Sequence, residues 1–192
     1  KEKGTTVKQK NGNRLNPHKS KRYVPKEWDL QTPGQAYFDE LKRVTKRQII
    51  FGVEYVDWKG LGPGRIKWNK MVPDGVSFKG YELAYCSFID YTYDLDLLWS
   101  GMCQAKSLSE PTTQQGNKKL NEKRIHPTQK PVLLYKKLLL FYKEQMGDDL
   151  FLPESLSVLD THVGSGSSRI ACFDMNIDFF GYEIDDDHFN DQ

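Results

Sequence analysis

The amino-acid sequence predicts a single domain of the α/β class. Its 192 residues can bury one hydrophobic core but are too few for two independent ones. Helical patterns alternate with short apolar runs that are typical of buried strands. Towards the C-terminal end the order is strand, helix, strand, so a parallel βαβ unit with a right-handed crossover is expected there.

The first expected element is a helix over residues 32–46. Thr32 is a favourable N-cap residue, Pro33 suits the first helical position, and Gln35 completes a capping box with Thr32. The hydrophobic residues expected to be buried on this helix are Tyr37, Phe38, Leu41 and Val44.

Three apolar runs follow and are expected to form strands. They cover residues 47–56, 64–70 and 81–89 and are rich in β-branched and aromatic side chains. Residues 101–125 are polar and show neither helical nor strand periodicity. A loop of this length inside a compact domain is usually functional or disordered.

A second helix is expected over residues 131–146, with Gly147 as its stop signal. The βαβ unit then comprises a strand over 157–159, a helix over 167–175 and a strand over 178–184. The face of the 131–146 helix expected to be buried consists of Val132, Tyr135, Leu138, Leu139 and Tyr142.

The charge is distributed unevenly along the chain. Residues 1–29 hold nine Lys/Arg against three Asp/Glu, residues 30–146 hold 18 against 12, and residues 147–192 hold one against 11. Residues 1–29 are expected to form a mobile basic loop that orders on an acidic partner such as a phosphate backbone. The acidic region suits a small ligand with hydroxyls or a cationic centre, and solvated polar faces are the alternative for each cluster.

Cysteine usage and hydropathy exclude two classes of protein. Cys86, Cys103 and Cys172 lack the spacing of a disulfide framework or a zinc site, so a reducing, cytoplasmic setting is expected. No apolar run approaches the roughly 20 residues that a membrane helix needs, and the chain does not start with a signal-peptide pattern. A soluble protein without a membrane partner or a bound metal is therefore expected, and its oligomeric state stays open.

A glycine-rich stretch, "VLDTHVGSGSSRIAC" at residues 158–172, is the strongest candidate for a ligand site. Gly164, Ser165 and Gly166 stand where a buried strand turns into a helix, so their amides can meet an anionic group. Glu183 ends the next strand, where nucleoside-binding folds place an acid that holds the ribose hydroxyls. Loop and acid are therefore expected to hold the two ends of one nucleoside ligand.

The spacing around this loop limits the choice of ligand. The full G-x-G-x-x-G pattern is not met because Arg169 occupies the third glycine position, and a tight turn beside a surface Glu is the alternative. Arg169 is also the only Lys or Arg in residues 147–192, whereas a dinucleotide with two phosphates would gain from more. A ligand with a cationic centre fits this acidity better.

Three segments together carry a resemblance to a known family. "RIHPTQKP" at 124–131, "VLDTHVGSGSSRIAC" at 158–172 and "FFGYEID" at 179–185 resemble the cofactor half of DNA amino-methyltransferases with the β arrangement of motifs, in particular phage and restriction-modification adenine methylases. Residues 28–56 and 65–88 are similar to segments that follow the catalytic motif in that family. The resemblance implies a Rossmann-like fold of S-adenosylmethionine (SAM)-dependent methyltransferases, with a mostly parallel central sheet and a circularly permuted motif order.

The resemblance also implies roles for individual residues. Its first motif, which wraps the methionine part of the cofactor, matches Asp160, Thr161, Gly164, Ser165 and Gly166, and its ribose-binding acid matches Glu183. Its H-P-T-Q-K-P segment, whose polar groups line the same pocket, matches His126, Pro127, Thr128, Gln129 and Lys130.

Some of these residues have simpler alternatives. Thr128 could cap the following helix, and His126 and Lys130 could be surface residues. His162 is expected to be a structural variant of the motif and not a catalyst.

The catalytic tetrad of that family is missing from the sequence. It consists of an acid, Asn or Ser followed by Pro-Pro and an aromatic residue, and this chain contains no Pro-Pro; the nearest string is "NPHK" at residues 16–19. The chain is therefore expected to start shortly after such a motif, to end before the last helix and to be inactive alone. The domain is expected to comprise a basic loop (1–29), part of a catalytic and DNA-binding half (30–125) and a SAM-binding half (126–192).

The implied substrate is double-stranded DNA, with adenine N6 as the methylated amine. The alternatives are cytosine N4, an inactive relative that binds SAM and DNA, and a nucleotide-dependent oxidoreductase that uses the glycine loop. DNA is expected to lie on residues 1–29 and on the polar loop through Lys106, Lys118, Lys119, Lys123 and Arg124. Trp28, Trp58 and Trp68 are possible stacking groups, although Trp58 and Trp68 are equally suited to a core.

Overall fold

The computed structural model describes residues 30–73, 79–100, 102–147 and 156–190. By its contacts the chain divides into residues 1–31 and 32–192, and the architecture given below is that of the second part. The basic loop expected over residues 1–29, with Trp28, lies outside the described residues.

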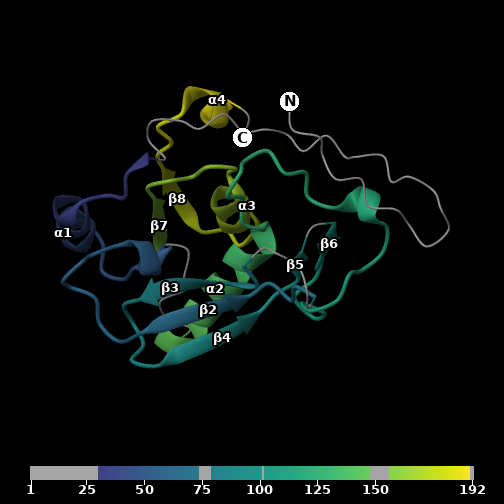
Figure 1. Ribbon diagram of the computed structural model, residues 1–192, viewed down its shortest axis with the longest axis horizontal. Coiled ribbons are helices and arrows are strands. Elements are labelled where there is room, and N and C mark those ends of the chain that lie inside the picture. Colours follow the sequence, from purple (N-terminus) through teal and green to yellow (C-terminus); the bar gives the residue numbers. More distant parts are fainter. Residues whose placement is uncertain (1–29, 74–78, 101, 148–155, 191–192) are drawn as a thin grey trace, which may run out of the picture. The chain divides into compact units, whose positions relative to one another are not determined.

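A four-stranded sheet forms the centre of this part (Figure 1). Its strands are β1 (Ile49–Phe51), β2 (Arg65–Asn69), β3 (Tyr81–Cys86) and β4 (Thr92–Asp96), in the order β1-β3-β2-β4. The strand expected over 47–56 is cut short because Gly52 turns the chain with φ +72° into a 3-10 helix, η2 (Val53–Tyr55).

The direction of the strands corrects one expectation. β3 runs antiparallel to both β1 and β2, and only β2 and β4 pair in parallel. The prediction of a mostly parallel central sheet is therefore wrong for this sheet, which is mixed. The reason is that β2 and β3 follow each other and pair directly, whereas parallel neighbours need a longer crossover, usually through a helix.

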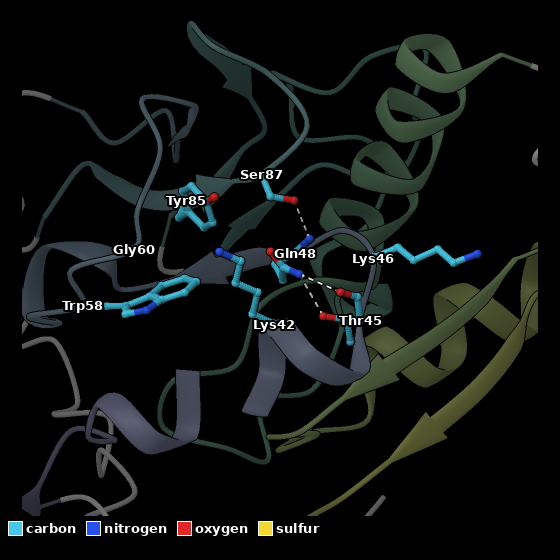
Figure 2. Close-up of a pocket in the computed structure, with 8 residues that line it drawn as sticks. All are labelled: Lys42, Thr45, Lys46, Gln48, Trp58, Gly60, Tyr85 and Ser87. Atoms are coloured by element: carbon cyan, nitrogen blue, oxygen red, sulfur yellow. Dashed lines mark hydrogen bonds between the residues drawn. The ribbon is translucent and has the colours of Figure 1, made fainter. Parts of the chain in front are cut away.

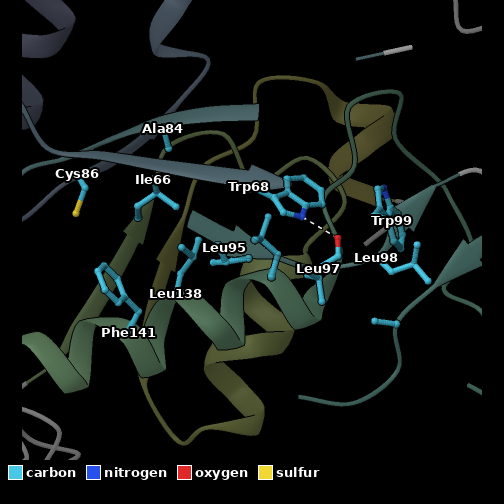
Figure 3. Close-up of a cluster of buried hydrophobic side chains, with 12 residues drawn as sticks. Ile66, Trp68, Ala84, Cys86, Leu95, Leu97, Leu98, Trp99, Leu138 and Phe141 are labelled. Atoms are coloured by element: carbon cyan, nitrogen blue, oxygen red, sulfur yellow. Dashed lines mark hydrogen bonds between the residues drawn. The ribbon is translucent and has the colours of Figure 1, made fainter. Parts of the chain in front are cut away.

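One face of the sheet is covered by α2 (Val132–Met146), which lies behind β2 and β4 in Figure 1. The helix buries Leu134, Leu138 and Phe141 at the i, i+4 and i+7 spacing of one helical face. The core that they enter is drawn in Figure 3 and includes Ile66, Trp68, Ala84, Cys86 and Leu95.

The buried face of α2 was predicted incorrectly at four of its five positions. Of the five residues expected there only Leu138 is buried, and Val132, Tyr135, Leu139 and Tyr142 are half-buried. The helix is apolar on more than one side. It packs on the sheet and also contacts α3 (Ser167–Asp174). Periodicity alone could not decide which of these sides meets the larger core. Gly147 ends the helix as expected, with φ +88°.

A smaller apolar cluster lies on the opposite face of the sheet. It joins Phe38 of α1 (Gln35–Val44) to Val53, Trp58 and Tyr85. Phe38 and Trp58 stack with their ring centroids 5.2 Å apart. Because neighbouring residues on a strand face opposite ways, Tyr85 enters this cluster while its neighbours on β3 enter the larger core.

The start of α1 differs from the predicted capping box. The N-cap is Gly34 without a side-chain cap bond, and Nε2 of the Gln35 side chain donates instead to Asp39 Oδ1 at 2.8 Å. Val44, which was expected to be buried, is 49% exposed. Phe38 is the member of the predicted face that is fully buried, and Tyr37 and Leu41 are half-buried.

The predicted βαβ unit is confirmed. β7 (Ser157–Asp160) pairs in parallel with β8 (Asp178–Gly181), and α3 connects them. β8 ends at Gly181, three residues earlier than expected, and is followed by a short helix, α4 (Asp186–Asn190), that the sequence pattern did not predict. In the part of the chain that the structure describes, β7 and β8 form a sheet of their own.

The polar stretch between the core elements contains more order than its composition suggests. Two short strands, β5 (Trp99–Ser100) and β6 (Cys103–Gln104), pair antiparallel, and η3 (Lys118–Leu120) is a 3-10 turn. Glutamine side chains hold the stretch together: Gln104 Nε2 donates to the Glu122 carbonyl at 3.2 Å, and the Gln104 amide donates to Gln114 Oε1 at 2.7 Å.

Gly64 offers a sharp test of the packing at the edge of β2. A Cβ placed on Gly64 would collide with the backbone carbonyl oxygens of Ile89 and Cys86, which cannot turn away as a side chain could. We expect Gly64→Ala to lower the free energy of unfolding by about 2 kcal/mol, as overpacking does elsewhere. The control is Gly34→Ala, because a Cβ at Gly34 would meet nothing within 4 Å. Urea unfolding measures both, and equal stability of the two variants would contradict the expected clash.

No described helix combines the length and the hydropathy that crossing a membrane requires. Likewise, no group of three or more His, Cys, Asp or Glu side chains in the described ranges is placed to hold a metal ion.

Candidate nucleoside site at the ends of β7 and β8

Asp160 ends β7 and is held from two sides. Its Oδ1 accepts the amide of His162 at 2.9 Å, and its Oδ2 accepts the hydroxyl of Ser168, in the first turn of α3, at 2.6 Å. Its carbonyl also accepts the amide of Tyr182 at 2.9 Å, which continues the pairing towards β8. The carboxylate is therefore fixed where the strand turns into the helix.

The glycine loop and the predicted ribose acid do meet. The Gly164 amide donates to Glu183 Oε2 at 2.7 Å, and the Asp185 amide donates to Glu183 Oε1 at 3.0 Å. The parallel pairing of β7 and β8 brings their carboxyl ends to the same edge, which explains the contact. The Gly164 amide thus meets this carboxylate, where a ligand anion was expected. An ionised carboxylate has about four acceptor sites, so Glu183 can still accept hydroxyl donors.

The backbone of the loop requires its two glycines. Gly164 has φ +56° and Gly166 has φ +74°, both in the left-handed region that residues with a Cβ rarely adopt. Ser165 between them points its hydroxyl at Ser167, with 2.9 Å between the oxygens. The turn leads directly into α3. The first backbone amides of this helix have no acceptor inside the helix.

The H-P-T-Q-K-P segment lies against this loop. An ideal Cβ on Gly164 would be 3.6 Å from the ring of His126, so the ring is in van der Waals range of the loop backbone. His126 is buried, whereas Pro127 and Thr128 are exposed. The structure therefore brings together His126, Gly164 and Glu183, which lie far apart in the sequence.

A tight turn sets the conformation of this segment. The Gln129 amide donates to the His126 carbonyl at 3.3 Å, and Gln129 Oε1 accepts the Ile125 amide at 2.8 Å. Thr128 does not cap α2, because its hydroxyl lies 3.1 Å from His126 Nδ1 and the N-cap of the helix is Pro131. The first amide of α2, at Val132, is satisfied instead by the carboxylate of Glu122.

Lys130 is not a plain surface residue. Its ammonium lies 3.5 Å from Glu82 Oε2 and 4.6 Å from the ring centroid of Phe51, and its side chain is only 17% exposed. Glu82 also pairs with Lys70 at 2.6 Å. Burial alone would raise the pKa of Glu82, but the two ammonium groups hold this pKa below its ordinary value. The segment is thereby tied to β3.

Two residues that join the site were not predicted there. The hydroxyl of Tyr37, on α1, lies 2.6 Å from Thr161 Oγ1 and 3.5 Å from Nδ1 of the exposed His162. His188, on α4, places its ring centroid 4.2 Å from that of His126. The helical spacing of Tyr37 predicted a core residue. No feature of the sequence predicted the contact between His126 and His188.

Burial lowers the pKa of His126 below its ordinary value of 6.5, and the neighbouring His188 adds to this effect. Glu183 and Asp185 oppose the lowering, and Lys130 supports it. The Thr128 amide donates to His126 Nδ1 at 3.3 Å, so this nitrogen is an acceptor and the neutral ring carries its proton on Nε2.

The lowered pKa of His126 predicts a pH dependence of stability. A histidine whose folded-state pKa is depressed binds fewer protons folded than unfolded, so its contribution is complete above about pH 6.5 and is lost as the pH falls below that value. We expect the free energy of unfolding of the wild type to fall more between pH 7.5 and 5.5 than that of His126→Gln. Urea titrations at the two pH values measure this, with His162→Gln as the exposed control. Identical pH dependence in wild type and His126→Gln would contradict it.

The groups proposed to contact DNA are only partly accessible. Trp58 and Trp68 are core residues, 6% and 0% exposed, which removes them as stacking groups. Arg124 lies over the ring of Trp99, 4.7 Å from its centroid, and Lys106 donates to the Asn117 carbonyl at 2.5 Å. Lys119 and Lys123 are exposed on the polar stretch.

One hollow of the described surface lies away from these residues. It has a volume of about 310 Å³ and lies between α1 and the end of β3 (Figure 2). None of the eleven residues predicted to bind the cofactor lines it.

Comparison with known proteins places the chain in a family. No curated protein matches it. Among solved structures it is similar to the crystal structure of the M1.HpyAVI-SAM complex, with 21% sequence identity and a TM-score of 0.34 over 66% of this chain and 58% of that chain. The chain thus spans less than two thirds of that protein's length. The model of the N6/N4 methyltransferase family, described as DNA methylase, matches residues 4–191. The chain therefore belongs to the N6/N4 DNA methylase family.

Proposed function

We propose that the chain carries the SAM-binding part of a DNA methyltransferase that methylates the exocyclic amine of a flipped base, with adenine N6 as the target. The observation that supports this most is the meeting of three separate segments at the Gly164 amide: the glycine loop itself, the Glu183 carboxylate at 2.7 Å and the ring of His126. Membership of the N6/N4 family supports the reaction class.

The residues present suit a nucleoside with a charged amino-acid end. In this proposal Glu183 accepts the ribose hydroxyls with its remaining lone pairs, while the first amides of α3 and the Ser165 hydroxyl receive the carboxylate of the methionine part. Asp160 holds the loop in place from the β7 side, and Thr161 is itself held by the Tyr37 hydroxyl of α1. SAM supplies a methyl group on a cationic sulfur, a charge that the acidic C-terminal region tolerates better than it would a pyrophosphate.

The remaining predicted residues have supporting roles. His126, Thr128 and Gln129 form the turn that packs on the loop, and Lys130 fastens this turn to β3 through Glu82. Pro127 is exposed next to His126. Together these residues orient the ligand, and orientation alone contributes several kcal/mol, in order of magnitude, to a transfer reaction.

Double-stranded DNA is the proposed partner. A duplex hides the exocyclic amine from an in-line attack, so the target base must leave the stack. The exposed Lys119 and Lys123 are suited to phosphate contacts, together with the predicted basic residues 1–29. Cytosine N4 is the alternative target within the same family. The order of motifs in this proposal is permuted, with the SAM-binding half following the catalytic one.

The sequence contains no Pro-Pro tetrad that would bind the target amine. We therefore expect residues 1–192 alone to bind SAM without transferring its methyl group. Analysis of the methylated base formed by a longer protein that includes such a tetrad would distinguish adenine N6 from cytosine N4.

Calorimetric titration of residues 1–192 tests the ligand. SAM is expected to bind measurably and NAD is not, and Asp160→Ala is expected to abolish SAM binding because the loop loses the carboxylate that holds both His162 and Ser168. The matched control is Asp178→Ala, an exposed aspartate at the start of β8. Preference for NAD, or SAM binding that Asp160→Ala leaves intact, would overturn the proposal.

A further inference from the structure

The charged side chains that line the hollow between α1 and the end of β3, here called the α1–β3 pocket, are all positive. Lys42 and Lys46 line it, and no carboxylate does. Neither ammonium forms an ion pair with any described residue. Figure 2 shows the Lys42 side chain reaching towards Tyr85, while Lys46 extends away from the other labelled residues. The pocket is therefore suited to an anion that meets Lys42 first.

The hydroxyl of Tyr85 opens into the pocket and has no protein partner among the described residues. Tyr85 is only 6% exposed, and within the described residues its phenol group forms no hydrogen bond. Every fully enclosed polar side-chain atom of the described residues has a hydrogen-bond partner. The Tyr85 oxygen has none, so it is not fully enclosed and is accessible from the hollow that Tyr85 lines. The hydroxyl can therefore donate to an acceptor placed in the pocket.

A second hydroxyl is also ready to donate. Ser87 Oγ accepts the amide of Gln48 at 2.8 Å, which leaves the proton of this hydroxyl for another acceptor. The pocket thus offers an ammonium and two hydroxyl donors, from Lys42, Tyr85 and Ser87. This combination recognises the oxygens of a phosphate.

Gly60 lies against Trp58 on the aromatic side of the pocket. An ideal Cβ on Gly60 would lie 2.9 Å from Nε1 of Trp58, closer than real Cβ atoms approach. Trp58 itself is locked by its stacking on Phe38, so it cannot move aside freely. The hollow has a volume of about 310 Å³, near the lower limit for ligand pockets.

The position along α1 connects the pocket to the candidate nucleoside site. Tyr37 contacts Thr161 of that site, and Lys42 follows five residues later on the same helix. At about 1.5 Å per residue the two points are about 7.5 Å apart along the helix axis, which equals roughly two base-pair steps of DNA. The two residues also lie about 140° apart around the helix, so the pocket and the contact with Thr161 are on different sides of α1.

We infer that the α1–β3 pocket holds a backbone phosphate of the DNA that the protein binds, an inference that rests on the proposed function. Lys42 pairs with the phosphate, and the Tyr85 and Ser87 hydroxyls donate to its oxygens. Such a contact positions the duplex without reading its sequence. The adjoining hollow, which shares Ser87, is lined by Asp90 and is less suited to an anion.

The salt dependence of DNA binding tests the inference on the full chain. With a labelled 20-base-pair duplex and 50–200 mM KCl, Lys42→Gln is expected to reduce the slope of log affinity against log salt by about 0.9, the value for one phosphate contact. Between these salt concentrations the affinity of the variant then falls about 3.5-fold less than that of the wild type. Tyr85→Phe, which keeps the buried ring, is expected to weaken binding about threefold or more without changing the slope.

The control for charge is Lys136→Gln, because Lys136 pairs with Asp174 between α2 and α3, away from the pocket. A slope that Lys42→Gln leaves unchanged, or that Lys136→Gln reduces equally, would overturn the inference, as would a wild type that does not bind the duplex. Inorganic phosphate serves as a separate probe and shows whether the pocket binds a free phosphate or one of DNA. If phosphate alone saturates the pocket and Lys42→Gln leaves the salt slope of DNA binding unchanged, the DNA contact is also excluded. SAM titration of the same variants is expected to match the wild type, so a failure of the proposed function would show separately.

Discussion

Replacing Trp68 with alanine is expected to lower the free energy of unfolding by about 3–5 kcal/mol, a large part of the stability of a domain of this size. Trp68 is 0% exposed and lies in the main core, which also includes residues of α2 (Figure 3). Its removal leaves a cavity that the strand backbone cannot close. The Leu97 carbonyl also loses the indole N–H that donates to it at 3.0 Å.

Two further variants separate the causes of this loss. Trp68→Phe keeps most of the ring volume but leaves the Leu97 carbonyl without its donor, so a smaller loss of about 1–3 kcal/mol is expected. Phe173→Ala is the matched control, because Phe173 is 83% exposed on α3 and its truncation leaves no cavity. Urea unfolding followed by circular dichroism measures all three. A Trp68→Ala variant as stable as Phe173→Ala would contradict the core described above.

The second large effect is expected at Glu183. Its carboxylate accepts two backbone amides, those of Gly164 and Asp185, at 2.7 and 3.0 Å. Glu183→Ala removes both acceptors and, in the proposed function, the group that binds the ribose. Hydrogen bonds to a charged group contribute about 1.5–3 kcal/mol, so we expect SAM affinity to fall by about 10- to 150-fold in calorimetric titration.

Glu183→Gln resolves what the charge contributes. Its amide oxygen can accept one of the two backbone amides, but its NH₂ group would face the other N–H, so an intermediate loss of affinity is expected. Asp178→Asn, also on the β8 segment and exposed, makes the same charge change without touching the loop and is expected to bind SAM as the wild type does. If Glu183→Ala bound SAM like Asp178→Asn, Glu183 would not be the ribose acid.

Local patterns were sufficient for the C-terminal unit. The apolar run before Asp160, the glycines at 164 and 166 and the helix after them predicted the βαβ unit, since each element depends on residues next to it in sequence. Strands β4, β5 and β6 were missed for the opposite reason. Each is two to five residues long and is defined by pairing: β4, for example, exists as the parallel neighbour of β2.

Helix faces show the same limit. The spacing in residues 131–146 predicted a helix correctly, yet Leu134 and Phe141 are buried in place of four of the expected residues. The helix carries apolar residues on several sides, and which of them faces the sheet depends on contacts with strands more than 30 residues away in the chain. Trp58 and Trp68 are likewise buried by contacts with residues distant in the sequence.

By itself, the sequence determined the α/β class, the βαβ unit, the glycine positions and the resemblance that led to the methylase family. Only the tertiary structure decided the mixed direction of the central sheet, the bond between Gly164 and Glu183, the packing of His126 on the loop and the position of Tyr85 at the α1–β3 pocket. The physical reason is the range of the interactions. Periodicity and backbone preference act over a few neighbouring residues, whereas each of these contacts joins residues distant in sequence and exists only after the strands have paired.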